Sequence, residues 1–457
     1  MTPTRVTLVI LGASGDLTSR LLLPGLGTLL KNRLAHDVRL VGAAVEAMPA
    51  AQWRSLVATA LGEGGCPADE LGPLLASTEF VQLDVTNREH LAALLARVDE
   101  PGRPVVLYFA LPPTVSQRAC ELLADLELPD GLRLAIEKPF GSSLESAQEF
   151  NRVLTSVVPE DQIFRVDHYL GKATVLNLLG LRFANRIFEP IWNATNIEWV
   201  DIVVDEQLAL EGRAGYYDHA GALRDMVQSH LLLVLAMVAM EAPARIDALE
   251  VRDLMSHTLR RVHLVGDSGS SSRRARYTAG TVDGRAVPDY VDEEGMDTAN
   301  KTETLAEVEL EIRNARWAGV RFRLRSGKAL GSGVRAIIVK FREVAYLPEG
   351  FEGRAPANVL VLGMAPESIQ LAIATNGGGR AWNFEVTPLS IQLGQSELRP
   401  YGEILEGIIT GDPLLSVRGD VAEECWRILT PVLEAWRAGE VPLEEYPAGS
   451  DGPNSWD

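Results

Sequence analysis

The chain has 457 residues, of which 46% are hydrophobic and 6% aromatic, so its composition is that of a globular protein. A chain of this length usually divides into two domains, because one hydrophobic core rarely organises so many residues. With 43 Lys and Arg against 62 Asp and Glu, the net charge is -19, which argues against nucleic acid or an anionic membrane as a partner. The same charge repels phosphorylated ligands, so a site for one would need a local group of basic residues.

The cysteines and the apolar segments predict a reduced, cytoplasmic protein. Cys66, Cys120 and Cys425 are odd in number and far apart, which argues against a disulfide framework and a zinc site, so we expect no metal. Residues 1–5 lack the apolar core of a signal peptide. The longest apolar run, 231–240, is shorter than a membrane span. We therefore expect no membrane association.

Predicted strands and helices alternate in the first part of the chain. Apolar runs typical of buried strands lie at 6–11, 38–45, 80–83, 105–110 and 132–136, and helical patterns lie at 17–31, 51–61 and 88–98. This alternation predicts a parallel sheet wound on both faces by helices. We therefore predict an α/β, Rossmann-like dinucleotide-binding domain over residues 1–170.

The pattern changes after about residue 170, where predicted strands follow one another with few helices between them. These strands lie at 200–205, 305–312, 320–325, 336–341, 359–364 and 368–375. They predict an α+β domain over residues 171–457 with a large, mainly antiparallel sheet. We expect the Ser- and Arg-rich stretch 266–275 to be an exposed loop, and the tail after Pro447 to be frayed.

A glycine turn follows the first predicted strand, as Gly12-Ala-Ser14-Gly15-Asp16-Leu17. Glycines at this place let the backbone approach the pyrophosphate of a dinucleotide, which the N–H groups of the helix N-terminus then receive. The third glycine of the full G-x-G-x-x-G pattern is missing, so a tight strand-to-helix connection is the alternative. Because the turn is the first in the chain, we predict a cofactor site at Gly12, Ser14, Gly15, Asp16 and Leu17.

A lysine follows a later predicted strand, in Glu137-Lys138-Pro139-Phe140-Gly141. Ligands of open α/β sheets bind at the carboxyl ends of the strands, so Lys138 is expected to point into the binding crevice. Pro139 would stiffen the turn, through a cis bond if one is present. A solvated loop lysine is the alternative. Ala110, at the end of the strand expected at 105–110, is a further candidate for cofactor binding.

The stretch Arg165-Val-Asp167-His168-Tyr169-Leu-Gly171-Lys172 concentrates polar chemistry in a few residues. His168, Tyr169 and Lys172 could bind a phosphate with direct hydrogen bonds and charge. This is the local basic group that the acidic net charge requires. The alternative is that the aromatic side chains only pack at a domain boundary.

A histidine, His230, ends the stretch Arg224-Asp225-Met-Val-Gln228-Ser-His230, just before the apolar run 231–240. A single histidine beside an apolar helix is more often a core residue than a catalyst. By itself, His230 therefore leaves both interpretations open.

Taken in order, these motifs closely resemble the glucose-6-phosphate dehydrogenase family, and the resemblance spans nearly the whole chain. The matching stretches are GASGDL at 12–17, EKPFG at 137–141, RVDHYLGK at 165–172, RFANRIFEPIWN at 182–193, RDMVQSHLL at 224–232, GMD at 295–297 and RSGKAL at 325–330. The resemblance implies oxidation of C1 of glucose 6-phosphate to 6-phosphoglucono-1,5-lactone, with hydride transfer to NAD or NADP. This is the first step of the oxidative pentose phosphate pathway.

The resemblance also implies a role for each matching residue. His230 would be the general base for the C1 hydroxyl, and Asp167 would orient its ring and stabilise the imidazolium. The 6-phosphate would be held by His168, Tyr169 and Lys172. Lys138 would bind the substrate and bridge it to the cofactor. The other substrate contacts would come from Glu206, Asp225 and Lys328, in a cleft between the two domains. Members of the family commonly pair through the large sheet of the second domain, so a homodimer or homotetramer is expected.

The sequence departs from the family pattern at three places. Leu21 stands where a substrate-binding lysine usually falls, and Gly333 where a basic residue is often seen, although Arg335 lies two positions further on. After the second strand, Val45 and Glu46 stand where NADP-preferring enzymes place an arginine for the 2′-phosphate. A carboxylate suits a ribose 2′-hydroxyl and repels a phosphate. The family favours NADP and these residues favour NAD, so the choice stays open.

Two other functions remain as alternatives at this point. Another NAD(P)-dependent sugar or sugar-phosphate dehydrogenase could share the glycine turn, the Glu-Lys-Pro motif and the Asp/His pair. A non-catalytic sugar-phosphate-binding regulator descended from such an enzyme could have lost the lysine at Leu21.

Overall fold

The computed structural model describes residues 4–32, 36–210, 214–377, 382–394 and 396–456, which belong to two compact units. The first unit contains Met1–Lys172, Pro243–Asp253 and Ser396–Trp426. The second contains Ala173–Ala242, Leu254–Gln395 and Arg427–Asp457.

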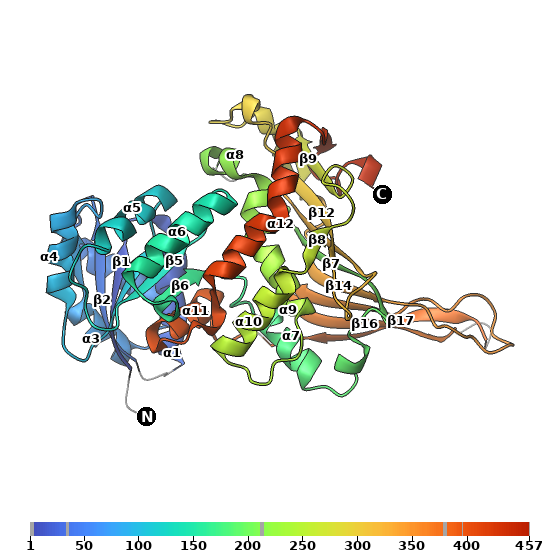
Figure 1. Cartoon of the computed structure of the whole chain (residues 1–457), viewed down its shortest axis with the longest axis horizontal. Coiled ribbons are helices and arrows are strands. Elements are labelled where there is room, and N and C mark those ends of the chain that lie inside the picture. Colours follow the sequence, from blue (N-terminus) through green and yellow to red (C-terminus); the bar gives the residue numbers. More distant parts are fainter. Residues whose placement is uncertain (1–3, 33–35, 211–213, 378–381, 395, 457) are drawn as a thin grey trace. The chain divides into compact units, whose positions relative to one another are not determined.

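The sheet of the first unit confirms the predicted doubly wound fold (Figure 1). Its strands are β1 (Thr4–Leu11), β2 (His36–Ala44), β3 (Glu79–Gln82), β4 (Val105–Phe109), β5 (Arg133–Glu137), β6 (Ile163–Val166) and β18 (Ser416–Val417). They are ordered β18-β6-β5-β4-β1-β2-β3, and all neighbours are parallel except β18, which is antiparallel to β6. The strand order reverses between β1 and β4, which is where such sheets bind ligands.

The helices of the first unit cover this sheet. They are α1 (Leu23–Lys31), α2 (Ala50–Glu63), α3 (Ala68–Ser77), α4 (Arg88–Val98), α5 (Pro113–Leu123), α6 (Leu144–Val157) and α11 (Pro400–Thr410), with a π-helical turn η1 (Thr18–Leu22) before α1. The helices expected at 51–61 and 88–98 are confirmed as α2 and α4, whereas α3, α5 and α6 were not predicted. The apolar sides of α1, α2, α3 and α11 join the buried faces of β1, β2 and β4 in one hydrophobic core.

The second unit contains the large, mainly antiparallel sheet that the sequence predicts (Figure 1). Its strands are β7 (Ile197–Asp205), β8 (Val262–Leu264), β9 (Ser272–Thr278), β12 (Leu305–Ile312), β13 (Arg321–Gly327), β14 (Arg335–Phe341), β15 (Val359–Met364), β16 (Glu367–Asn376), β17 (Phe384–Gln392) and β19 (Leu443–Pro447). They are ordered β17-β16-β15-β14-β7-β13-β12-β9-β19, with β8 also paired to β12. Only the pairs β7–β13 and β9–β19 are parallel among the described strands of this sheet. A separate small hairpin pairs β10 (Gly280–Val282) with β11 (Arg285–Val287).

Two expectations for this unit were wrong. The stretch 266–275 is not wholly an exposed loop, because β9 begins at Ser272 and lies between β12 and β19. Arg274 of β9 is buried, and its guanidinium donates to the carbonyl oxygens of Val441 and Trp436, which compensates for its loss of water. The tail after Pro447 is not frayed either, since Trp456 packs in a hydrophobic cluster and its indole N–H donates to Glu444 Oε1 at 2.8 Å.

The apolar run 231–240 ends a longer helical stretch made of α8 (Ala214–Ala222), the π-helical segment η4 (Leu223–Leu231) and α9 (Leu232–Ala239). By length and composition alone, Tyr217–Ala239 could cross a membrane, but 83% of its apolar window is buried inside the protein. The indole N–H groups of Trp192 and Trp317 donate to carbonyl oxygens at the end of α9, each at 2.8 Å. These features are those of a core helix. The remaining helices are α7 (Ala173–Phe183), α10 (Ala248–Leu259) and α12 (Gly419–Ala438).

Candidate active site

The glycine turn after β1 lies at the point where the strand order reverses. Gly12 has φ +85°, and a Cβ atom there would lie 2.2 Å from the carbonyl oxygen of Ala110, so only glycine fits. The Gly12 and Gly15 amides donate to Ala43 O at 2.8 Å and to Gly12 O at 3.0 Å. The turn therefore brings the predicted cofactor residues Gly12, Gly15 and Ala110 together, and the helix that follows begins beside Asp16 and Leu17. In folds of this kind, a glycine turn at this place lets the backbone approach a pyrophosphate, which the N–H groups at the helix start receive.

A side-chain hydrogen bond links this turn to the end of β2. The hydroxyl of Ser14 donates to Glu46 Oε2 at 2.9 Å. Val45, the residue before Glu46, is 56% exposed. In folds of this kind, an acidic side chain after the second strand accepts hydrogen bonds from the adenosine ribose. The structure thus holds the Glu46 carboxylate in place through Ser14, and both predicted cofactor residues lie at one site.

Lys138 stands at the carboxyl end of β5, as predicted, and the Lys138–Pro139 peptide bond is cis. The residue before it, Glu137, accepts hydrogen bonds from the hydroxyls of Tyr108 and Tyr401, the latter at 3.3 Å. Burial raises the pKa of Glu137 to about 7, although both hydroxyl donors act to lower it. Sequence reasoning did not assign a role to Glu137 or identify the two tyrosines.

The predicted phosphate-binding residues occupy one turn directly after β6. Tyr169 donates its amide to Asp167 Oδ1 at 3.0 Å, and Lys172 Nζ lies 4.1 Å from the centroid of the Tyr169 ring. The His168 ring stacks on Tyr401, with centroids 5.6 Å apart and planes at 14°. The structure therefore brings His168, Tyr169 and Lys172 together and places Asp167, only 1% exposed, at the base of the same turn.

Two predicted substrate residues of the second unit form an ion pair. Glu206 follows β7 and Lys328 follows β13, and their Oε2 and Nζ atoms are 2.6 Å apart. Arg335, at the start of β14, binds the other carboxylate oxygen of Glu206 at 3.2 Å. The strands β7 and β13 are parallel neighbours and β14 is the antiparallel neighbour of β7, which explains why these three side chains meet. Sequence reasoning noted Arg335 but did not assign it to the site.

Segment η4 carries the remaining predicted residues, Asp225 and His230. His230 is 2% exposed, so its imidazole is a buried group on a buried helix. Just before η4, Gly221 has φ +67°, and the carboxylate of Glu303 occupies the space beside it. Glu303 Oε1 accepts a hydrogen bond from Leu223 N at 2.9 Å, which satisfies an amide at the start of the segment. Asp225 and His230 belong to the second unit, and Asp167 to the first.

A parallel sheet with a glycine turn at its switch point, joined to a second unit with a buried histidine, is typical of dehydrogenases that use a nicotinamide dinucleotide. Comparison with known families specifies the kind. The family described as "Glucose-6-phosphate dehydrogenase, NAD binding domain" matches residues 9–177, and "Glucose-6-phosphate dehydrogenase, C-terminal domain" matches residues 179–457. The chain belongs to the glucose-6-phosphate dehydrogenase family.

Individual relatives agree with this assignment. The glucose-6-phosphate 1-dehydrogenases of Treponema pallidum and Gluconobacter oxydans are each 38% identical to this chain; the alignments cover 98% and 97% of it, and 92% and 94% of the relatives. A solved glucose-6-phosphate dehydrogenase in complex with its substrate glucose 6-phosphate has a TM-score of 0.89 at 30% identity and covers 99% of this chain and 96% of its own. The enzyme from Mycobacterium avium has a TM-score of 0.84 at 31% identity, with the same coverage.

Proposed function

We propose that this protein oxidises C1 of glucose 6-phosphate to 6-phosphoglucono-1,5-lactone, the first step of the oxidative pentose phosphate pathway, in the cytoplasm. The observation that carries the proposal is the turn after β6, where His168, Tyr169 and Lys172 lie together. In a chain of net charge -19, this turn gives the 6-phosphate a local basic site. Family membership supports the same substrate.

Substrate binding far from the reacting carbon positions that carbon for reaction. His168, Tyr169 and Lys172 hold the phosphate, while Lys138 contacts the substrate on the cofactor side. Glu206 and Asp225 accept hydrogen bonds from sugar hydroxyls, and Lys328 reaches the sugar from the turn after β13. The guanidinium of Arg335 binds the carboxylate of Glu206, so it lies beside a proposed substrate residue. From there Arg335 supplies the cation that is missing at Gly333.

The chemical step needs one proton acceptor from the protein. His230 takes the proton of the C1 hydroxyl, and Asp167 orients the imidazole and stabilises its charged form. When bound, the nicotinamide dinucleotide accepts the hydride that leaves C1. Low exposure of His230 and Asp167, 2% and 1%, suits this role, because charge interactions are stronger away from water.

We also propose that NAD is the better of the two cofactors for this enzyme. The Glu46 carboxylate, held by Ser14, can accept a hydrogen bond from the ribose 2′-hydroxyl of NAD. The same charge repels the 2′-phosphate of NADP. Val45 provides no positive charge to offset that repulsion.

Steady-state kinetics with glucose 6-phosphate or glucose, each with NAD and NADP, tests the reaction. We expect turnover of glucose 6-phosphate and little of glucose. In His230→Asn, we expect kcat to fall about 10²–10⁴-fold with a modest change in KM, because a general base is lost. The matched control is His257→Asn, an exposed histidine of α10, which should leave kcat unchanged.

Each alternative predicts a different result in the same assays. Equal turnover of glucose would indicate a dehydrogenase of unphosphorylated sugars. Binding without turnover of any hexose 6-phosphate would indicate a regulator. Wild-type kcat in His230→Asn would remove the proposed base.

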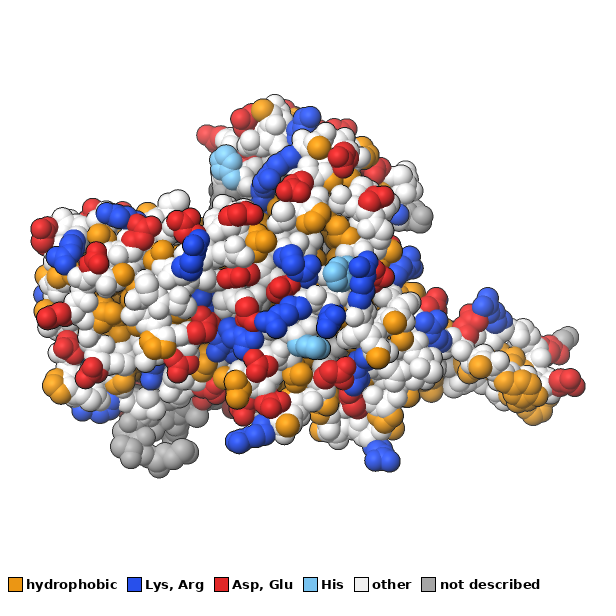
Figure 2. All heavy atoms as spheres, in the orientation of Figure 1, with side chains coloured by type: hydrophobic (Ala, Val, Ile, Leu, Met, Phe, Trp, Pro, Cys, Tyr) orange, Lys and Arg blue, Asp and Glu red, His pale blue; other side chains and the backbone are white. Residues whose placement is uncertain are grey.

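We further propose that the protein is a homodimer or homotetramer that associates through β16 and β17. Strand β17 lies at the end of the sheet order, and Val386, Leu389 and Ile391 on it are 57%, 55% and 59% exposed. Figure 2 shows hydrophobic side chains gathered on the β16–β17 projection. Exposed apolar residues on an edge strand are costly in a monomer and are typical of an interface.

Sedimentation measurements test this association. Replacing Leu389 and Ile391 together by lysine should shift the protein to monomer, whereas Arg54→Glu on the exposed side of α2 should not. A wild-type protein that sediments as a monomer at micromolar concentration would contradict the proposal.

A further inference from the structure

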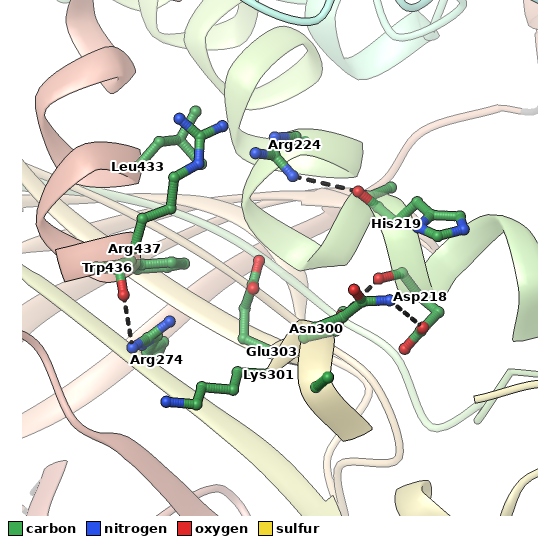
Figure 3. Close-up of a pocket in the computed structure, with 13 residues that line it drawn as sticks. Asp218, His219, Arg224, Arg274, Asn300, Lys301, Glu303, Leu433, Trp436 and Arg437 are labelled. Atoms are coloured by element: carbon green, nitrogen blue, oxygen red, sulfur yellow. Dashed lines mark hydrogen bonds between the residues drawn. The ribbon is translucent and has the colours of Figure 1, made fainter. Parts of the chain in front are cut away.

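A pocket of about 470 Å³ lies wholly within the second unit and is separate from every residue assigned above to substrate or cofactor (Figure 3). It is enclosed by α8 and the start of η4, the segment that precedes β12, strand β9 and the end of α12. The residues that line it are Asp218, His219, Ala220, Arg224, Arg274, Ala299, Asn300, Lys301, Thr302, Glu303, Leu433, Trp436 and Arg437. Its volume is in the range of small-molecule sites, about 300–1,000 Å³.

The lining is rich in positive charge, although the protein as a whole is strongly acidic. Four cationic side chains, Arg224, Arg274, Lys301 and Arg437, come from four different elements, and Figure 3 shows them around Glu303. Among the residues that the structure describes, the carboxylates in the lining are Asp218 and Glu303. Four positive charges against two negative ones leave an excess of two. In a chain of net charge -19, such a local excess attracts anions.

Both carboxylates are already used by the protein. Asp218 accepts hydrogen bonds from Tyr290 at 2.8 Å, from the Asp297 amide at 3.1 Å and from Asn300 at 2.6 Å. Glu303 accepts one from the Leu223 amide at the start of η4, and burial raises the pKa of its carboxyl. These hydrogen bonds fix both acids in place, and Glu303 also interacts electrostatically with Arg224 and Arg274, so the two acids offset only two of the four positive charges.

Three of the four cations, Arg224, Lys301 and Arg437, have spare donors, whereas Arg274 donates to the carbonyl oxygens of Val441 and Trp436. The buried Nε of Arg224 has no hydrogen-bond partner among the described residues, and Nη1 donates only to the His219 carbonyl at 3.2 Å. Lys301 and Arg437, both exposed, form no ion pair with any residue that the structure describes. Burial lowers the pKa of Arg224 and of Arg274. Buried cationic donors without an acceptor are costly, and an anion in the pocket would remove that cost.

We propose that this pocket binds a small phosphate-bearing metabolite. Arginine and lysine together favour phosphate, because guanidinium groups bind its oxygens in pairs and the ammonium adds a point charge. The dianionic charge of a phosphate ester matches the excess of two positive charges. The site adjoins Asp225 through its neighbour Arg224, but the proposal does not depend on the reaction proposed above.

Calorimetric titration of the full chain with inorganic pyrophosphate tests the site. Because the turn at His168–Lys172 and the glycine turn at Gly12–Leu17 should also bind phosphate groups, every titration is done in a Lys172→Ala background with saturating NAD present. We expect saturable binding there, weakened at least tenfold when Lys301 and Arg437 are both changed to alanine. The control changes Arg54 and Arg152, two exposed arginines of α2 and α6, to alanine and should alter the affinity less than twofold. Lys301→Arg should retain the affinity, which separates lost charge from lost folding.

Three results would overturn the proposal. The first is no saturable heat with pyrophosphate in the Lys172→Ala protein. The second is equal weakening in the Lys301/Arg437 variant and in the Arg54/Arg152 control, which would indicate only a general charge effect. The third is tighter binding of citrate than of pyrophosphate, which would exclude phosphate as the preferred class. Turnover of glucose 6-phosphate, measured separately in the Lys172 wild-type background, reports on the proposed reaction and not on this site.

Discussion

Replacing Glu46 by glutamine should shift the enzyme from NAD toward NADP. The carboxylate is exposed and held by Ser14 at 2.9 Å, so it faces solvent with a fixed position. Two unit charges about 4 Å apart in water repel by about 1 kcal/mol, and a phosphate monoester carries about -1.5 to -2 charges. Removing the Glu46 charge should therefore favour NADP by about 1.5–2 kcal/mol. This corresponds to a rise of about 10–30-fold in kcat/KM for NADP.

The effect on NAD should have the opposite sign. A hydrogen bond to a charged group contributes about 1.5–3 kcal/mol. Because glutamine retains part of this hydrogen bond, kcat/KM for NAD should fall, but by less than the loss of the whole bond would cause. The assay is kcat/KM for both cofactors at fixed glucose 6-phosphate, with Glu70→Gln, an exposed acid of α3, as the charge-matched control. If the NADP-to-NAD ratio of Glu46→Gln changes no more than that of Glu70→Gln, Glu46 does not contact the ribose and the reasoning fails.

Two other predictions concern the first unit. Gly12→Ala places a Cβ 2.2 Å from Ala110 O at a positive φ. We therefore expect the free energy of unfolding, measured by chemical denaturation, to fall by at least about 1–3 kcal/mol. The control is Gly62→Ala, which has open space at its Cβ and should cost little. Burial raises the pKa of Glu137 to about 7 in the folded protein, whereas the unfolded chain releases this proton near pH 4.5. The folded state therefore binds more protons between these pH values, and Glu137 lowers the free energy of unfolding progressively as pH rises from about 4.5 to 7. The difference in unfolding free energy between Glu137→Gln and wild type should therefore change by about 3 kcal/mol in favour of the variant from pH 4 to pH 8. The same difference at both pH values, measured by denaturation, would refute the assignment.

Continuous apolar runs predicted much of the fold. The strand expected at 305–312 is β12 with the same bounds, and those at 359–364 and 368–375 are β15 and, within one residue at each end, β16. Strand β9 was missed because its Ser and Arg residues resemble a loop, and the buried Arg274 within it is satisfied by carbonyl acceptors at Val441 and Trp436. Such acceptors come from distant parts of the chain and leave no local pattern.

The same limit applies to the candidate site. The turn at His168, Tyr169 and Lys172 was predicted because its residues are close in sequence. The hydrogen bond between Tyr401 and Glu137 joins residues 264 positions apart, so no spacing rule could reveal it. Arg335 was noted, yet its contact with Glu206 depends on the pairing of β14 with β7, which only the sheet order shows.

The division of the chain has a practical consequence for work with fragments. Helix α11 belongs to the first unit, and Tyr401, Ile404, Leu405, Ile408 and Ile409 on it are part of that unit's hydrophobic core. A truncated protein ending at Lys172 would keep the whole glycine turn but expose the apolar surface that α11 covers. Such a piece should aggregate on expression, so cofactor affinity is better measured on the intact polypeptide.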